Sequence, residues 1–173
     1  MQKNVFKYSL LFLLLLVLQI VLLNNIRISG YAYPQIYILF ILILPVGIAP
    51  WLLLVSAFAL GLVMDMFSNS LAIHTAASVF MAFCRPGVIK MVAGKVFSDD
   101  TFRPGFQSFG GYSLFTYVVF LVLLHHLTLF FLEVFRFSEV LHTLSRALLS
   151  ASLSVIFIMI GLALLDRPDT RSK

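Results

Sequence analysis

Long runs of apolar residues, separated by short polar connectors, occupy most of this chain and constrain its fold more than any other feature. Hydrophobic residues make up 61% of the 173 residues and charged residues only 11%, and the mean hydropathy is +1.06. A soluble domain of this size could not bury so much apolar surface. Because the runs are continuous rather than alternating, they indicate helices and not the strands of a barrel. We therefore predict an all-α integral membrane protein with a single transmembrane domain over residues 1–173.

Six of these runs are candidates for spanning helices, since a helix needs about 20 mostly apolar residues to cross a bilayer. The six candidate spans are Tyr8–Leu23, Tyr33–Ile48, Pro50–Phe67, Ala72–Ile89, Tyr112–Leu132 and Leu141–Leu165. The second run is the least regular, because Pro34 and Pro45 interrupt it. A re-entrant segment is the alternative interpretation of that run.

The basic residues predict how the chain is oriented. If all six runs cross, nine of the twelve Lys and Arg residues lie on the side of the two termini. These nine are Lys3, Lys7, Arg85, Lys90, Lys95, Arg103, Arg167, Arg171 and Lys173, whereas Arg27, Arg136 and Arg146 lie on the other side. If the second run did not cross, most of this charge would lie outside. The positive-inside rule therefore favours six crossings with both termini in the cytoplasm. The pI of about 9.6 then follows from basic residues at the cytoplasmic surface, where anionic lipid attracts them, and requires no nucleic-acid partner.

An acidic residue lies at the end of the third run, where a charge near hydrocarbon is costly and often functional. Asp65 follows Gly61 by four residues, so both share one helix face. A polar turn separates this run from the next one, which begins near His74. The sequence predicts a helical hairpin with Asp65 and His74 facing each other across its tip. A structural tie and a functional role are both open for Asp65.

Polar and small residues recur at four-residue spacing on three of the predicted helices, which is typical of faces where membrane helices pack together. The three stripes are Ala57–Gly61–Asp65, His74–Ser78–Ala82 and His142–Arg146–Ser150–Ser154. The predicted topology places the charged and histidine side chains toward the outer half of the membrane or its outer interface, namely Asp65, His74, His125, His126, Glu133, His142 and Arg146. We expect an Asp65–His74 hydrogen bond and an Asp65–Arg146 ion pair there. The candidate site, either for a partner or ligand or for structural packing, consists of Gly61, Asp65, His74, His125, His142 and Arg146.

No pattern in the sequence indicates a cofactor or a metal. His125 and His126 are adjacent, so on a helix they point about 100° apart and do not readily serve one ion. Four phenylalanines (Phe130, Phe131, Phe135 and Phe137) resemble an aromatic belt at the outer interface, although they could also contact a partner. An intramembrane hydrolase would need a paired nucleophile and base, and the scattered His and Ser residues do not supply that spacing. We therefore expect a protein that is not an enzyme.

The hairpin also resembles a known family. Residues 57–67 read AFALGLVMDMF and residues 71–76 read LAIHTA, which is similar to the GLxxD motif and following turn of the rod shape-determining protein MreD. Length, hydropathy and number of apolar runs are similar as well, so the resemblance covers most of the chain. It implies a non-enzymatic inner-membrane subunit of the bacterial cell-elongation machinery. Its expected partner is MreC, a bitopic protein, and through it MreB filaments and the peptidoglycan polymerase and transpeptidase.

The MreD family is itself reported to resemble the substrate-binding subunits of energy-coupling-factor transporters. That likeness implies a compact bundle of six transmembrane helices with a pocket open to the outside. It also supplies an alternative function, in which the chain is the substrate-binding subunit of a transporter for a small, vitamin-like molecule. The same outer-half polar residues would then form the ligand site.

Overall fold

The computed structural model describes residues 2–25, 33–93, 102–134 and 140–166. Within these ranges the chain forms helices and turns and no strand. The long helices are α1 (Gln2–Val21), α3 (Pro50–Ser68), α4 (Ile73–Ala93), α6 (Gly111–Val134) and α7 (Val140–Leu165), and the short ones are η1 (Leu23–Asn25), α2 (Leu39–Ile43) and α5 (Phe106–Phe109). The expectation of an all-helical chain is thus confirmed for the described residues.

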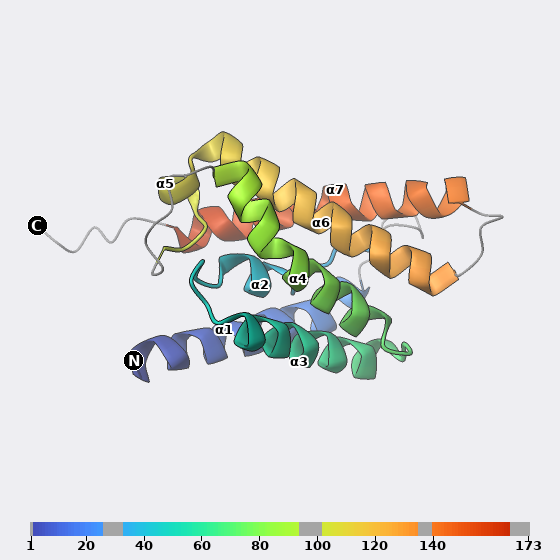
Figure 1. Cartoon of the computed structure of the whole chain (residues 1–173). Helices are drawn as coiled ribbons and strands as arrows, with labels where there is room; N and C mark the ends of the chain where they lie inside the picture. Colours follow the sequence, from blue (N-terminus) through green and yellow to red (C-terminus); the bar gives the residue numbers. More distant parts are fainter. Residues whose placement is uncertain (1, 26–32, 94–101, 135–139, 167–173) are drawn as a thin grey trace, which may run out of the picture.

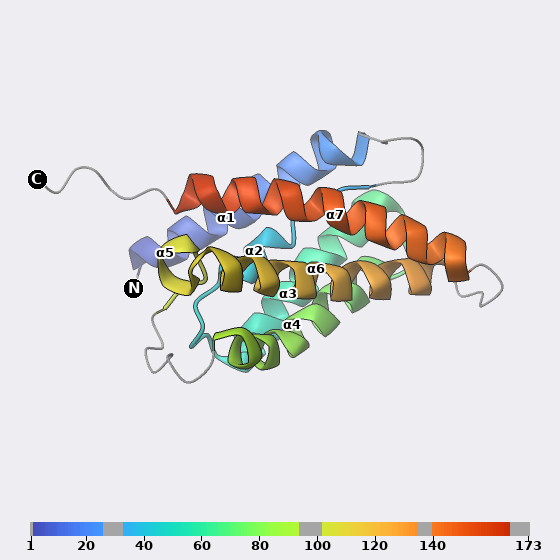
Figure 2. The ribbon, with the colours of Figure 1, turned by 90° about the horizontal axis from the view of Figure 1, so that it is seen from above.

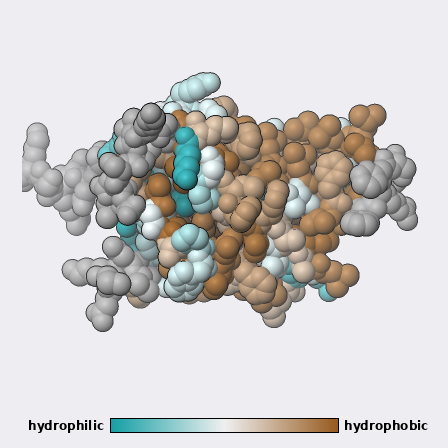
Figure 3. All heavy atoms as spheres, in the orientation of Figure 1, coloured by the Kyte–Doolittle hydropathy of each residue, from teal (hydrophilic) through white to brown (hydrophobic). Residues whose placement is uncertain are grey.

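Four of these helices are long and apolar enough to cross a membrane. They are Pro50–Ser68, Ile73–Val92, Gly111–Val134 and Val140–Leu165, and α1 contributes a shorter apolar stretch over Phe6–Val21. Large apolar side chains are exposed along the outside of these helices, for example Leu14, Phe58 and Ile156, each at least half exposed. Figure 3 shows that apolar side chains cover most of one face of the molecule. This is the surface expected of a protein whose outer solvent is lipid.

The helices pack side by side in the order α3, α4, α6 and α7, and α1 contacts α3 (Figures 1 and 2). Their ends gather at two opposite ends of the bundle. We call one the Arg103 end, where the start of α1, the residue Arg103 and the end of α7 meet around a small pocket. We call the other the hairpin end, where the end of α1, the turn between α3 and α4, and the end of α6 meet around a larger pocket.

The structure corrects the second predicted helix. Of residues 33–48, here called the threaded segment, only Leu39–Ile43 are helical, and the others are turn or irregular backbone. It lies inside the bundle: Tyr37, Ile38, Ile41 and Leu42 are completely buried. Figures 1 and 2 both show α2 in the middle of the molecule, and in Figure 1 it lies between α1 and the α6–α7 pair. Non-helical backbone at membrane depth is tolerated only where protein surrounds it and satisfies its polar groups.

Candidate functional site

The predicted hairpin between α3 and α4 exists, and Gly61 is the residue that lets the two helices touch. A Cβ atom built on Gly61 would lie 2.7 Å from the Thr75 backbone N and 2.8 Å from the His74 carbonyl oxygen, and it would also collide with the Thr75 Cα. Real Cβ contacts are longer than this, so any side chain at residue 61 would push α3 away from α4. The predicted packing stripe is confirmed, because Ala57, Gly61 and Asp65 are all buried.

Asp65 ties the hairpin together one turn later. Its Oδ1 accepts hydrogen bonds from the Ser70 hydroxyl at 2.6 Å and from the His74 backbone N–H at 2.9 Å. Its Oδ2 accepts from the backbone N–H of Thr75 at 2.9 Å and from the Thr75 hydroxyl at 2.6 Å. The first N–H groups of a helix have no partner within that helix. Since α4 begins at Ile73, the Asp65 carboxylate caps α4 from the neighbouring helix and carries the charge that a helix N-terminus favours.

The expected contact between Asp65 and His74 is confirmed, whereas the expected ion pair with Arg146 is wrong. His74 Nδ1 lies 3.1 Å from Asp65 Oδ1 and 2.9 Å from the Ser70 hydroxyl. Arg146 instead donates to Glu133 of α6 at 3.3 Å, and its guanidinium stands over the Phe130 ring at 5.0 Å from the centroid. Arg146 does not pair with Asp65 because hydrogen-bond donors from residues 70–75 already occupy both oxygens of the Asp65 carboxylate.

The two adjacent histidines of α6 point to different neighbours. His125 Nε2 is 2.8 Å from the hydroxyl of Tyr37 in the threaded segment. His126 Nε2 is 3.0 Å from the hydroxyl of Ser154 in α7, and its Nδ1 is 2.9 Å from the Val122 carbonyl. Each ring therefore joins α6 to a different element. Within residues 2–25, 33–93, 102–134 and 140–166, no three His, Cys, Asp or Glu side chains gather as metal ligands would.

The predicted polar stripe on α7 (His142–Arg146–Ser150–Ser154) is buried only in its second half. Ser150 and Ser154 are buried, and their hydroxyl oxygens accept hydrogen bonds from the backbone N–H groups of Tyr33 and Gln35 at 3.0 Å and 2.8 Å. His142 is exposed in the first turn of α7, and Arg146 is half-buried one turn later. Of the six predicted site residues, the structure thus brings Gly61, Asp65 and His74 into one cluster and places His125 beside it through Tyr37, whose ring centroid lies 6.3 Å from that of His74.

The predicted aromatic belt is wrong for Phe130. Phe130 is almost completely buried and packs against His126, with ring centroids 6.3 Å apart, so it belongs to the interior and not to the interface. Phe131 is half-buried. Phe135 and Phe137 lie outside the described residues.

Sequence reasoning missed Gln19, a single amide within the leucine-rich run of α1. Gln19 is almost fully buried. Its Oε1 accepts from the Ile36 backbone N–H at 2.7 Å, and its Nε2 donates to the Pro34 carbonyl at 3.0 Å. One side chain thereby satisfies the irregular backbone at the start of the threaded segment. A lone polar residue in an otherwise apolar span is the signal that could have identified it.

The sequence predicts Arg85 at the cytoplasmic surface, whereas the structure buries it. Only 1% of the residue is exposed. Its Nε donates to the Tyr117 hydroxyl at 2.9 Å, and its guanidinium also donates to the carbonyls of Leu42 and Leu44. Leu42 lies in the last turn of α2 and Leu44 directly follows it, so both carbonyls are at the end where a helix dipole is negative. Among the described residues no carboxylate pairs with Arg85, so the backbone of the threaded segment is its counterpart.

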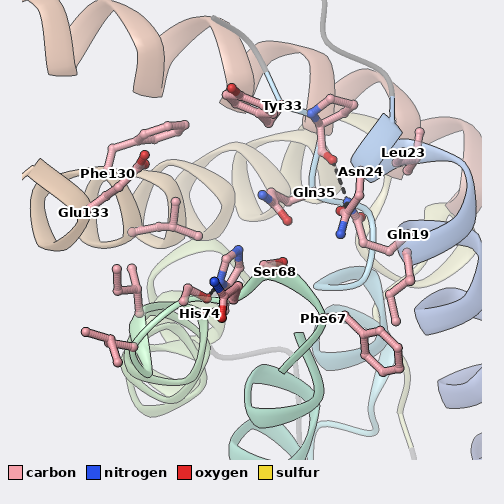
Figure 4. Close-up of a pocket in the computed structure, with 17 residues that line it drawn as sticks. Gln19, Leu23, Asn24, Tyr33, Gln35, Phe67, Ser68, His74, Phe130 and Glu133 are labelled. Atoms are coloured by element: carbon pink, nitrogen blue, oxygen red, sulfur yellow. Dashed lines mark hydrogen bonds between the residues drawn. The ribbon is translucent and has the colours of Figure 1, made fainter. Parts of the chain in front are cut away.

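A pocket of about 690 Å³ opens at the hairpin end, beside the Asp65–His74 cluster. Its polar lining includes Gln19, Gln35, His74 and Glu133, and its apolar lining includes Phe67, Leu71 and Leu129. Figure 4 shows Gln35 and His74 in the middle of the pocket, between Glu133 on one side and Gln19 on the other. The Gln35 Oε1 has no hydrogen-bond partner among the described residues. Pockets of this size commonly hold ligands or partner side chains.

Comparison with known proteins gives no relative: no protein-family model, no curated protein and no solved structure matches this chain.

Proposed function

We propose that this chain is a non-enzymatic inner-membrane subunit of the bacterial rod complex, similar to MreD, which helps to maintain cell shape and lateral peptidoglycan synthesis. One observation carries the proposal. The residues on which the sequence resemblance depends, Gly61 and Asp65, are the two that join α3 to α4, through a close backbone approach and through the cap on α4. A sequence motif whose residues make specific structural contacts supports a family resemblance better than a motif whose residues make no such contacts.

The proposed topology has six crossings with both termini in the cytoplasm, as in the energy-coupling-factor subunits that the fold is expected to resemble. The threaded segment is then the one crossing that is mostly not helical. Support comes from its contacts at both ends of the bundle. Its first residues bond Ser150 and Ser154, and the Val46 N–H donates to the Phe102 carbonyl near Arg103 at 2.8 Å.

The partner in this proposal is an MreC-like bitopic protein, and its binding surface is the pocket at the hairpin end. Leu71 lines this pocket and is 94% exposed, and Phe67 beside it is 64% exposed. Apolar side chains that project this far at a helix end, next to buried polar groups, form the mixed surface that a partner segment would cover.

The test compares two exposed leucines at the same end of the bundle. We expect Leu71→Asn to reduce co-purification of the MreC-like protein in mild detergent at least fivefold, while the chain accumulates normally. Leu141→Asn is the matched control, because Leu141 is 81% exposed but does not line the pocket. Equal retention of the partner by both variants would remove the pocket from the proposal. Absence of any MreC-like protein from the wild-type preparation would remove the function itself.

The volume of the pocket favours one second candidate, a substrate-binding subunit of a transporter for a small molecule. About 690 Å³ is room for a vitamin-sized ligand. The same purification distinguishes the two functions. A pair of ATPase subunits in the preparation, or a small molecule released on denaturation, would favour the transporter over the rod complex.

A further inference from the structure

We propose that a second pocket, at the Arg103 end of the bundle, binds the phosphate of an anionic phospholipid. This pocket has a volume of about 90 Å³ and lies between the start of α1, the residues around Arg103 and the end of α7. It is independent of the pocket at the hairpin end and of the function proposed above. Three features of the pocket support this assignment: its basic residues, the hydrogen bond that Asp166 already accepts, and its apolar lining.

Two cations line the pocket. Lys7 is exposed and Arg103 is half-buried, and the Arg103 guanidinium is held over the Tyr8 ring at 5.0 Å from the centroid. Within the part of the chain that the structure describes, neither Lys7 nor Arg103 pairs with a carboxylate. Arg103 is therefore positioned by an aromatic ring, and its charge has no carboxylate partner among the described residues.

Among the described residues that line the pocket, Asp166 is the acidic one, and its carboxylate already accepts a hydrogen bond. Asp166 Oδ2 accepts a hydrogen bond from the Gln107 backbone N–H at 3.1 Å. Its carboxylate also lies against Gly105, where an added Cβ would be 3.0 Å from both carboxylate oxygens. Asp166 thus fastens the end of α7 to the segment that follows Arg103, and the pocket keeps a net positive charge of one from Lys7, Arg103 and Asp166.

The rest of the lining is apolar, with Leu11 from α1, Ile43 from α2 and Leu162 and Leu165 from α7. Leu165 is half exposed, so the apolar wall continues to the outer surface of the bundle. Figure 3 shows hydrophilic side chains gathered toward this end of the face in view. A free phosphate ion would make no favourable contact with this apolar wall. A phospholipid has an anionic phosphate followed by an acyl chain, which matches the order of the basic residues and the apolar wall along the membrane normal. The Tyr8 hydroxyl in the wall has no hydrogen-bond partner among the described residues, so it can donate to the same headgroup after a small movement.

The test uses the full chain, purified in detergent and examined by native mass spectrometry with four probes: phosphatidylglycerol, phosphatidylethanolamine, phosphatidylcholine and inorganic phosphate. We expect phosphatidylglycerol to bind most tightly. Lys7→Gln and Arg103→Gln should each weaken its binding about fivefold, the factor that corresponds to ~1 kcal/mol for one basic residue at a lipid surface. Lys90→Gln is the matched control, since Lys90 is an exposed lysine of α4 that does not line the pocket.

Several results would overturn the proposal. Equal binding of phosphatidylcholine and phosphatidylglycerol would show that no anionic headgroup is selected. Binding of inorganic phosphate as tight as that of the lipid would identify a site for free phosphate. An equal loss of phosphatidylglycerol affinity in Lys90→Gln would mean that lipid binding depends on the overall charge of the protein and not on this pocket. Lys7 is exposed, so its variant keeps the test decisive even if Arg103→Gln lowers thermal stability.

Discussion

The carboxylate of Asp65 lies within hydrogen-bonding distance of two backbone N–H groups, two hydroxyls and one imidazole nitrogen, all from residues 70–75. A carboxylate in this position has no remaining capacity for a distant arginine. These contacts show a structural role for Asp65, and a direct role in binding a ligand or partner stays a prediction. Its function, in the proposal above, is to hold the shape of the hairpin end for a partner.

Asparagine at residue 65 tests this role. Asp65→Asn removes the charge and turns one acceptor into a donor that faces the Thr75 or His74 N–H. We expect a loss of roughly 2–3 kcal/mol, since hydrogen bonds to charged groups are the strong ones. Glu133→Gln is the control, because Glu133 is 44% exposed and exposed pairs contribute below ~1 kcal/mol. Thermal unfolding in detergent measures both, and equal midpoints would contradict the capping role.

Arg85 gives a second prediction at this scale. Because it satisfies several carbonyls of the threaded segment through a planar guanidinium, Arg85→Lys should not replace it, although lysine keeps the charge. We expect a loss of about 2 kcal/mol or more from the unpaired buried carbonyls, seen as a lower unfolding temperature and reduced accumulation in the membrane. Lys90→Arg on the same helix should leave both unchanged. A stable Arg85→Lys variant would mean that the carbonyls find other donors.

At the scale of elements, the close approach of α3 and α4 depends on the absence of one atom. Gly61→Ala adds a methyl group that meets backbone rather than a movable side chain, so the helices must separate. We expect a clear drop in the unfolding temperature. Gly87→Ala in α4 is the matched control, since an added Cβ there meets nothing within 4 Å and should be neutral or stabilising by up to ~1 kcal/mol. A neutral Gly61→Ala would refute the close contact.

Hydropathy and residue spacing explain which elements could be predicted from the sequence. α3, α4, α6 and α7 were predictable, because a continuous apolar run long enough to cross satisfies its backbone within one helix. The hairpin and its Asp65–His74 contact followed from i, i+4 spacing on two helices joined by a short turn. The threaded segment was not predictable in this way, since hydropathy measures the preference for an apolar environment and not the backbone conformation within it. Pro34 and Pro45 were the only local sign.

The hydrogen-bond and ion-pair partners of side chains on different helices could not be predicted from the sequence either. Arg85 lies at the end of an apolar run, and such a position by itself is typical of a surface cation. Only the fold brings Leu42 and Leu44 to its guanidinium. In the same way, Arg146 could have paired with any acid at the hairpin end, and it is the position of α7 beside α6 that selects Glu133.

For the whole molecule, the proposed topology predicts which end of the bundle faces outward. With Cys84 replaced by serine, a cysteine at Asn69 in the hairpin turn should react with a membrane-impermeant maleimide added to intact spheroplasts. A cysteine at Gln107, near Arg103, should react only after the membrane is opened. Both residues are exposed, so accessibility within the fold is matched. The reverse labelling pattern would mean that the protein has the opposite orientation in the membrane. Labelling of both residues in intact spheroplasts would place them on the same side and would contradict a single crossing by α4 between them.

The threaded segment has a consequence for how the protein is made. Its backbone donors at Tyr33 and Gln35 bond hydroxyls 117 and 119 residues further along the chain, and the Leu42 carbonyl accepts from Arg85, 43 residues later. Chains emerge from the ribosome from their N-terminus, so the α7 partners are not yet available when the segment reaches the membrane. Gln19 of α1 is the described partner that precedes the segment in the chain. We therefore expect the segment to stay in water or within the insertion machinery until α7 arrives, and a chain truncated before α7 to be degraded rather than inserted.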